Sequence, residues 1–197
     1  MSTAAILAGG QSKRMGFDKQ VLMIGQEAII QHQISILSKH FDQIMIISNN
    51  HLSDRFLTHE KVVVYEDVLK GYGPLGGIHS ALKHAYDPYV FIVACDMPEI
   101  DEDYLLYMKS QLKDYHALVT CYGDWIEPFH AYYHKSLVDP IEKYLRKGYR
   151  NISSLLKKHH VNYISESIAR VYSPDWSLFD NINTKEDLMS KLNSRNA

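Results

Sequence analysis

The feature that most constrains the fold is a short apolar run that ends abruptly in two glycines. Residues Ala4 to Ala8 are all apolar, and Gly9 and Gly10 follow them directly. An apolar run of this length bounded by glycine predicts a buried strand of the parallel type, and the glycine pair predicts a tight loop after it. We therefore expect a ligand site where the first strand ends.

The loop after this strand carries positive charge. Lys13, Arg14 and Lys19 lie in it, and its glycines allow the backbone to come close to a ligand. Exposed N–H groups together with fixed cations form a receptor for a polyphosphate. The loop is not a P-loop, because no Gly-Lys-Ser/Thr ends it, and it lacks the G-x-G-x-x-G spacing of dinucleotide-binding proteins. A solvated loop with scattered lysines is the alternative.

Composition narrows the class of protein. The 197 residues are 46% hydrophobic with a net charge of -2, which predicts one domain with a full core and argues against nucleic acid as a partner. No signal peptide is apparent, and no apolar run approaches the roughly 18 residues that a membrane span needs. The two cysteines lack a C-x-x-C spacing, which indicates a reducing compartment. We expect a cytoplasmic protein that does not contact the membrane.

The first half of the chain alternates between strand and helix patterns. Strands are expected at 44–48, 62–65 and 89–95, and helices at 27–38 and 78–85. This order predicts βαβ crossovers, and the strand at 89–95 is apolar throughout, which is typical of a central strand in a parallel sheet. The glycine-rich stretch 66–77 is expected to be a loop before the second helix. It is either a second place where N–H groups face an anion or a simple connection.

The second half departs from this alternation. Strands at 117–121 and 127–133 predict an antiparallel hairpin, with Pro128 at the start or edge of its strand. Helices are expected at 136–147 and 152–159, extended pieces at 161–164 and 169–172, and a last helix from Thr184. The eleven histidines have no partners at metal-ligand spacing, so all are expected at the surface. The whole pattern predicts an α/β fold with three layers and a Rossmann-like, mostly parallel sheet carrying an added antiparallel hairpin.

One carboxylate stands out for its place in this pattern. Asp96 directly follows the most apolar strand and is fixed by Pro98 two residues later. Open α/β sheets bind ligands at the carboxyl ends of their central strands. Mg²⁺ is commonly held by one or two carboxylates together with substrate phosphates, so Asp96 is a candidate magnesium ligand. The alternative is a cap for the helix expected at 102–112, although Asp101 fits that role better.

The order of residues in the first loop adds a resemblance to a known family. The run Leu7-Ala8-Gly9-Gly10-x-Ser12-x-Arg14-Met15-Gly16-x-Asp18-Lys19 resembles the signature loop of nucleotidyltransferases, most closely that of the molybdenum cofactor guanylyltransferases. A small departure is Gly76, where the family often has alanine, and we expect it to loosen the helix entry. Further elements match in family order, namely Glu66-Asp67, Gly73-Pro74-Leu75-x-Gly77-Ile78, Cys95-Asp96-x-Pro98, Pro128-Phe-x-Ala131-x-Tyr133, Lys147-Gly148-x-Arg150 and Asn181-Ile182-Asn183-Thr184.

The resemblance implies a fold of the nucleotide-diphospho-sugar transferase type. It implies a single domain, with a nucleotide-binding half at about 1–100 and an acceptor-binding half at about 101–197. It also implies site roles: Leu7, Ala8, Gly9 and Lys19 on the guanine nucleotide, Arg14 facing the triphosphate, Asp67 (or Glu66, by a slip of one) near the base or ribose, Asp96 on nucleotide and Mg²⁺, and Arg150, Asn181 and Asn183 as weaker candidates for the acceptor. The two asparagines have the alternative of stabilising a turn.

The implied reaction is transfer of GMP from GTP to molybdenum-bearing molybdopterin, with release of pyrophosphate. Arg14, Lys19 and Asp96 are the expected catalytic residues, and no general base is needed because the attacking phosphate is already anionic. Handover of a labile cofactor implies transient contact with cofactor-biosynthesis proteins or molybdoenzymes. Two alternatives stay open: a nucleotidyltransferase that uses CTP with molybdopterin or an NTP with a sugar phosphate, and a nucleotide-binding adaptor without activity.

Overall fold

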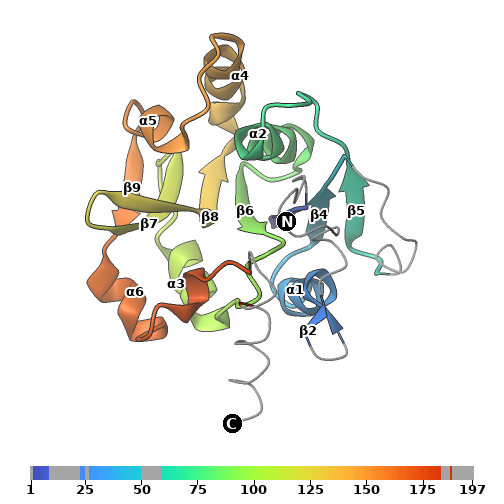
Figure 1. Cartoon of the computed structure of the whole chain (residues 1–197), viewed down its shortest axis with the longest axis vertical. Coiled ribbons are helices and arrows are strands. Elements are labelled where there is room, and N and C mark those ends of the chain that lie inside the picture. The colour runs from blue at the N-terminus through green and yellow to red at the C-terminus, as the bar shows by residue number, and fades with distance from the viewer. Residues whose placement is uncertain (1, 9–22, 25–26, 50–58, 183–186, 188–197) are drawn as a thin grey trace.

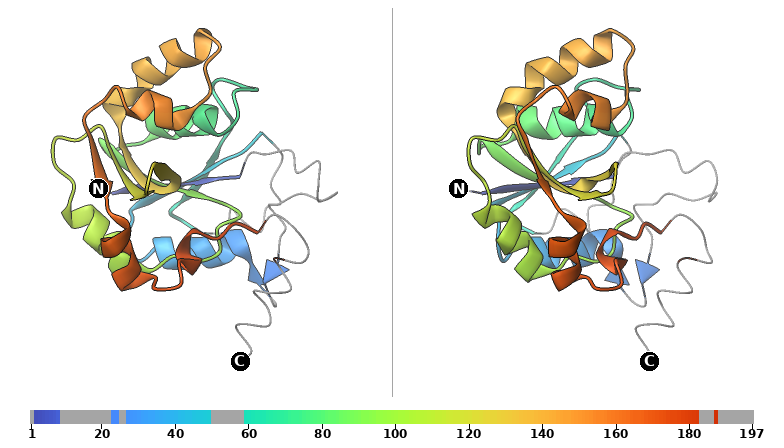
Figure 2. Two further views of the ribbon diagram at one scale, coloured as in Figure 1. Left: turned by 60° about the vertical axis from the view of Figure 1, so that its left-hand side comes forward. Right: turned by 90° about the vertical axis from the view of Figure 1, so that its left-hand side faces the viewer.

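The computed structural model describes residues 2–8, 23–24, 27–49, 59–182 and 187. Within them a seven-stranded sheet lies between two layers of helices (Figure 1; Figure 2). In sheet order the strands are β5 (Val62–Tyr65), β4 (Gln43–Ile47), β1 (Thr3–Leu7), β6 (Tyr89–Ala94), β8 (Trp125–His134), β7 (Ala117–Tyr122) and β9 (Val161–Ile164). One face is covered by α2 (Pro74–His84), α4 (Val138–Arg146) and α5 (Ile152–Leu156), and the other by α1 (Ile29–Leu37), α3 (Glu102–Ser110) and α6 (Glu166–Tyr172). The predicted three-layer α/β architecture is confirmed.

The first strand is buried on both of its faces. Ala4 and Ile6 belong to the core under α1 and α3, whereas Ala5 and Leu7 belong to the core under α2. A strand between two helical layers has no solvent face, which explains its continuous apolar run. β1 pairs in parallel with both β4 and β6, so the predicted βαβ crossover is confirmed.

The first helix begins two residues later than the pattern predicted. Glu27–Ala28 form β3, which pairs in antiparallel fashion with β2 (Met23–Ile24). The side chain of Gln31 accepts a hydrogen bond from the backbone N–H of Ala28 at 3.3 Å. The strand pairing and this contact together fix where the chain turns into α1.

The hairpin of β7 and β8 joins the sheet through β8. β8 is antiparallel to both β6 and β7, and β9 is parallel to β7. Pro128 lies inside β8, so its expected place at a strand start is wrong, but it falls in the stretch 128–130, which is paired with neither β6 nor β7. The pairing of β7 with β8 shifts register between Leu118 and Thr120. Proline is tolerated at such an irregularity because it has no N–H to give to a regular ladder.

The segment at 169–172 is helical, and its expected extended structure is wrong. It forms the end of α6, in which Glu166 accepts a hydrogen bond from Arg170 at 2.6 Å. Ala169 is fully buried, and the Tyr172 ring lies 5.2 Å from that of Tyr104 in α3. The β-favouring composition of this short piece is overridden by packing against α3.

The second helix begins at Pro74, four residues before the predicted start. Pro74 occupies the first helical position, after Gly73 with a φ of 63°. Gly76 therefore lies inside the helix, where a Cβ would meet the carbonyl oxygen of Leu69 at 3.0 Å and Cβ of Tyr72 at 3.2 Å. The preceding loop packs closely on this turn, so an alanine at position 76 would be crowded. The expectation that Gly76 loosens the helix entry stays a prediction.

Among the residues that the structure describes, two histidines are buried, contrary to the expectation that all lie at the surface. His79 in α2 is 0% exposed, and its Nε2 lies 3.6 Å from Oε2 of Glu142 in α4. His130 in β8 is also 0% exposed, with a φ of 117° that an L side chain rarely adopts. Its ring packs edge-on against Phe91 at 5.1 Å. The irregular section of β8 turns this polar side chain into the core, which the alternation of residues does not reveal.

Several further local predictions are confirmed. Asp101 caps α3 by accepting a hydrogen bond from the N–H of Tyr104 at 2.7 Å, so Asp96 is not the cap. Gly148 ends the α4 region with a φ of 87°, and Cys95 and Cys121 are both free thiols. Thr184, the expected start of a last helix, lies outside the described residues. None of the helices in the described part of the chain combines the length and apolar character of a membrane span.

Candidate functional site

The candidate residues gather at one edge of the sheet. β1, β4, β5 and β6 are parallel, and two antiparallel steps bring β7 back into the same direction. The carboxyl ends of these strands therefore share an edge, where Leu7 ends β1, Asp67 follows β5 and Asp96 follows β6. In open α/β sheets this edge is where ligands bind.

Asp67 is held by a residue that the sequence analysis did not single out. Nδ2 of Asn49, just after β4, donates to Oδ2 of Asp67 at 2.6 Å, and the N–H of Asp67 donates to Oδ1 of Asn49 at 3.1 Å. Burial raises the pKa of the Asp67 carboxyl, and the hydrogen bond from Asn49 partly opposes the rise. This reciprocal pair orients the carboxylate. The signal for Asn49 is its place directly after a buried strand.

Gly77 allows three pieces of chain to meet at this side of the edge. A Cβ at Gly77 would lie 3.3 Å from Cδ2 of Leu7 and 3.8 Å from Oδ1 of Asp67. The first turn of α2 thus packs directly on both side chains. Ala8 is buried as well, and its N–H donates to the carbonyl oxygen of Ile47 at 2.9 Å. The result is an apolar wall with one carboxylate, next to the amino terminus of a helix.

Glu66 is the neighbour with which the role of Asp67 is most easily confused. It is exposed and pairs with Lys70 one helical turn later. Asp67 instead faces Asn49 and Gly77. Of the two carboxylates, Asp67 is the one that lies with Leu7.

The loop that carries Asp96 is held from two sides. Gln33 of α1 is fully buried, and its Nε2 donates to the carbonyl oxygens of Ala94 at 2.9 Å and Met97 at 2.8 Å. From the other side the N–H of Ile182 donates to the carbonyl oxygen of Asp96 at 2.8 Å. Asp96 itself is partly exposed. Sequence reasoning missed Gln33, whose only signal is a polar residue on the apolar face of its helix.

A second carboxylate lies beside Asp96. Glu127 in β8 is 2% exposed, and its Oε1 accepts a hydrogen bond from the N–H of Phe129 at 2.8 Å. Burial raises the pKa of Glu127 to about 8, and the negative charge of Asp96 adds to the rise. The charge of Asp96 therefore acts on the Glu127 carboxyl. Glu127 was not among the predicted site residues, and its signal is a carboxylate directly before Pro128 in the hairpin.

The acceptor candidates reach the edge from opposite faces of the sheet. Asn181 is exposed and adjoins Ile182, which is bonded to Asp96. The guanidinium of Arg150 lies 4.3 Å over the ring of Tyr72, next to the amino terminus of α2. Four predicted site residues lie outside the described residues: Gly9, Arg14, Lys19 and Asn183.

The described residues offer no closed metal cage. Among them, no group of three or more His, Cys, Asp or Glu side chains is arranged to hold a metal ion. A site that shares its metal with substrate phosphates requires fewer protein ligands, because Mg²⁺ is commonly bound through one or two carboxylates. Asp96 with Glu127 nearby is a donor set of that size.

Comparison with known proteins agrees with this geometry. The family model of the MobA-like NTP transferase domain matches residues 4–162. The chain belongs to this family. It is a nucleotidyltransferase, as the resemblance of the first loop implied.

Relatives match over nearly the whole chain. The molybdenum cofactor guanylyltransferase of Syntrophotalea carbinolica is 44% identical, over 94% of this chain and 88% of that one. A probable molybdenum cofactor guanylyltransferase of Peptoclostridium acidaminophilum is 46% identical, over 94% and 86%. The crystal structure of molybdopterin-guanine dinucleotide biosynthesis protein A from Archaeoglobus fulgidus is similar with a TM-score of 0.83 at 27% identity, over 98% of both chains. The fold of this family member is thus the predicted nucleotidyltransferase type.

Proposed function

We propose that this protein transfers GMP from GTP to molybdenum-bearing molybdopterin, releasing pyrophosphate and forming molybdopterin guanine dinucleotide. Relatives named molybdenum cofactor guanylyltransferase at 44% and 46% identity support the nucleotide and the acceptor. The observation that carries the proposal is the place of Asp96. On one side of Asp96 lies the end of β1, with Leu7 and, beyond it, Asp67. On the other side lies the segment of Asn181 and Ile182.

The nucleotide is proposed to bind on the β1 and β5 side of Asp96. Leu7, Ala8 and Gly9 contact the guanine nucleotide, and the oriented carboxylate of Asp67 accepts hydrogen bonds from the base or the ribose. An aspartate pre-oriented by Asn49 loses little freedom when it binds. Arg14 and Lys19 supply the fixed positive charge that a triphosphate requires.

Asp96 is proposed to hold Mg²⁺ together with the phosphates of GTP. The raised pKa of Glu127 fits a nearby cation, because a divalent charge there would favour the ionised form of this buried carboxyl. Bound there, Mg²⁺ would stabilise the negative charge that develops on the leaving pyrophosphate. Gln33 keeps the Asp96 loop in place through two backbone carbonyls.

The acceptor is proposed to bind on the other side of Asp96. Asn181, Asn183 and Arg150 hold it so that its terminal phosphate faces the α-phosphorus of GTP. The attacking oxygen is already anionic, so the residues of this chain position it and need not remove a proton. The acceptor half corresponds to about residues 101–197 and the nucleotide half to about 1–100.

The test is pyrophosphate release by purified protein with Mg²⁺ and molybdenum-loaded molybdopterin, with GTP, CTP or UTP as the nucleotide. We expect release with GTP that requires the acceptor. Asp96→Asn should lower the rate at least about 10²-fold, since it removes charge at the point where charge develops. Asp103→Asn, an exposed aspartate in α3, is the matched control and should keep the wild-type rate.

Three outcomes contradict the proposal. Preference for CTP would indicate a sister activity on the same fold, as in the 2-C-methyl-D-erythritol 4-phosphate cytidylyltransferase of Thermus thermophilus, whose likeness at 11% identity shows the fold alone. Release that does not require the acceptor would remove molybdopterin as substrate. Binding without turnover would indicate an adaptor.

The setting of the reaction is part of the same proposal. We expect the protein to work in the cytoplasm and to pass its labile product by transient contact to cofactor-biosynthesis proteins or molybdoenzymes. A pull-down with the purified protein that recovers none of these partners would contradict the handover.

A further inference from the structure

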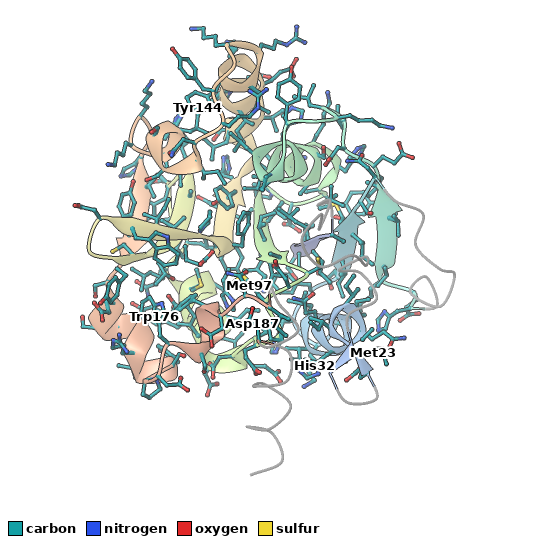
Figure 3. All side chains as sticks on the ribbon, in the orientation of Figure 1. Met23, His32, Met97, Tyr144, Trp176 and Asp187 are labelled. Atoms are coloured by element: carbon teal, nitrogen blue, oxygen red, sulfur yellow. The ribbon has the colours of Figure 1, made fainter. Side chains whose placement is uncertain are left out.

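Three large aromatic side chains gather beside the candidate site without being part of it. They are Tyr122 and Trp125 at the tip of the β7–β8 hairpin and Trp176 after α6, here named the aromatic cluster. Tyr122 is 49% exposed and Trp125 is 47% exposed. Trp176, labelled in Figure 3, lies near the hairpin and α6. Exposed aromatic side chains that gather in this way commonly mark a place where something binds.

The hairpin presents its two rings on one face. Tyr122 and Trp125 are directly paired across a two-residue turn in which Gly123 has a φ of 55°. Residues that are directly opposite in an antiparallel pair project to the same side, with Cβ atoms about 5 Å apart. The two side chains therefore leave the hairpin from neighbouring positions on one face.

Trp176 is fixed against this face. Its ring centroid is 5.6 Å from that of Tyr122 with an interplanar angle of 62°, and 4.6 Å from that of Phe179. The guanidinium of Arg170 lies 5.0 Å from its ring, and its backbone has a left-handed φ of 67°. These contacts fix the Trp176 ring beside Tyr122, so Tyr122 loses little freedom when a ligand binds next to it.

The aromatic cluster lies on the acceptor side of Asp96. β8 and β7 are the first and second neighbours of β6, so they stand about 5 and 10 Å from the line of β6 within the sheet. Trp125 is on the same strand and face as Glu127, the carboxyl that Asp96 repels. The segment that begins at Trp176 leads directly to Ile182, whose N–H is bonded to Asp96. Leu7 and Asp67 belong to the opposite side, beyond β6.

We propose that the aromatic cluster binds the flat pterin ring of the acceptor by stacking, while the acceptor phosphate lies at Asp96. This inference rests on the proposed function for the identity of the acceptor. Every planar heteroaromatic ring stacks favourably on tryptophan and tyrosine. Guanine is the other flat ring in the reaction, and the oriented Asp67 and the wall of Leu7 lie on the far side of Asp96, away from the cluster.

The chain offers a direct probe of this proposal. Its only two tryptophans are Trp125 and Trp176, so all tryptophan emission comes from the aromatic cluster. Titration with 6-hydroxymethylpterin, followed by absorption-corrected tryptophan emission and by calorimetry, measures binding without turnover. We expect the pterin to quench this emission, and GTP with Mg²⁺ to leave it nearly unchanged.

Two substitutions make the test specific. Trp125→Ala should raise the Kd for the pterin about tenfold, since one stacked ring is lost, and Trp125→Phe should recover most of the affinity. In the full reaction Trp125→Ala should raise the KM for the acceptor and leave the KM for GTP unchanged. Tyr86→Ala is the matched control, because Tyr86 is 70% exposed but lies before β6, at the opposite edge of the sheet.

Several results would overturn the proposal. The first is quenching of the tryptophan emission by GTP that is as strong as quenching by the pterin. The second is a Kd for the pterin that is unchanged in Trp125→Ala. The third is an increase in the KM for the acceptor in Trp125→Ala that occurs only when a protein partner is present. The last result would make the cluster a protein-docking surface. The protein could also bind the pterin through Trp125 but show no guanylyl transfer. That result would overturn the proposed function and would still support the stacking site.

Discussion

The two parts of the sheet on either side of the candidate site treat polar groups differently. In the parallel part, with β1, β4 and β5, the functional polar groups have partners: Asp67 is bonded to Asn49 in both directions. In the hairpin part, with β7, β8 and β9, His130 is buried with both ring nitrogens lacking a hydrogen-bond partner in the structure. Glu127 is buried there with only one backbone donor from within its own strand.

The difference shows where the burial of polar groups destabilises this fold. Burial without a partner disfavours the charged form of a group. His79, over the parallel part, is buried as well, but Glu142 lies 3.6 Å from it and opposes the lowering of its pKa, whereas no group among the described residues opposes the lowering of the pKa of His130. We therefore expect His130 to carry the larger pH dependence of stability. In the parallel part, polar contacts orient residues of the candidate site, as those of Gln33 do for the Asp96 loop. Substitutions in the two parts should therefore separate into effects on stability and effects on the nucleotide.

The largest expected effect concerns His130. Burial lowers its pKa to about 3, against about 6.5 for an unfolded histidine. Above pH 6.5 both states hold the neutral ring, whereas below it the unfolded state binds a proton that the folded state refuses. The free energy of unfolding should therefore fall by up to about 4 kcal/mol between pH 6.5 and pH 3 on account of this residue alone. Urea unfolding at a series of pH values measures the slope.

His130→Leu is the variant that isolates this contribution. It should lack the part of the acid slope that the histidine adds, so that wild type and variant differ most in their pH dependence below pH 6.5. His160→Leu, which removes an exposed histidine, is the control. Parallel slopes for wild type and His130→Leu would show that the hairpin part does not carry the pH dependence.

The second expected effect concerns the nucleotide and comes from the parallel part. Asp67→Ala removes a carboxylate that is proposed to accept hydrogen bonds from the base or ribose, and such bonds to a charged group are worth about 1.5–3 kcal/mol. We expect the KM for GTP to rise about tenfold or more, the KM for the acceptor to stay unchanged, and the free energy of unfolding to change little. Initial-rate kinetics with each substrate varied in turn measures both constants.

Asn49→Ala tests whether orientation matters as well as charge. It keeps the Asp67 carboxylate but removes its reciprocal partner, so the KM for GTP should rise less than in Asp67→Ala. An effect on the acceptor KM equal to that on GTP would break the division of the sheet into a nucleotide side and an acceptor side. Glu66→Ala, next to Asp67 but paired with Lys70, should change neither constant.

The same division explains what the sequence could predict. The parallel strands are apolar on both faces and are bounded by glycine or by polar residues, so their positions, the crossover and the place of Asp96 follow from local pattern. The structure of 169–172 depends on packing against α3, which is distant in sequence, and the burial of His130 depends on the register shift between β7 and β8. Gln33 stayed hidden for the same reason, since its partners are the backbone carbonyls of Ala94 and Met97, which only the fold brings near. Glu127 stayed hidden because its position relative to Asp96 depends on the pairing of β8 with β6.

The smallest expected effect lies where the two parts meet. Arg150 comes from the hairpin part, after α4, but its guanidinium lies over Tyr72, which directly precedes the glycine entry to α2. Its Nη1 also donates to the carbonyl oxygens of Leu145 at 3.2 Å and Tyr149 at 2.9 Å. This anchoring leaves the rest of the planar guanidinium to face an anion, which a lysine cannot imitate.

Arg150→Lys should therefore raise the KM for the acceptor only about threefold to fivefold, because it keeps the charge and loses a stacked contact worth about 0.5–1 kcal/mol. Arg146→Lys is the matched control, as Arg146 is exposed on α4 and paired with Glu142. An increase in the KM for GTP with the acceptor KM unchanged would assign Arg150 to the nucleotide. The boundary between the nucleotide side and the acceptor side would then lie near α5 and not beside β6. The expected position of the acceptor phosphate would change with it.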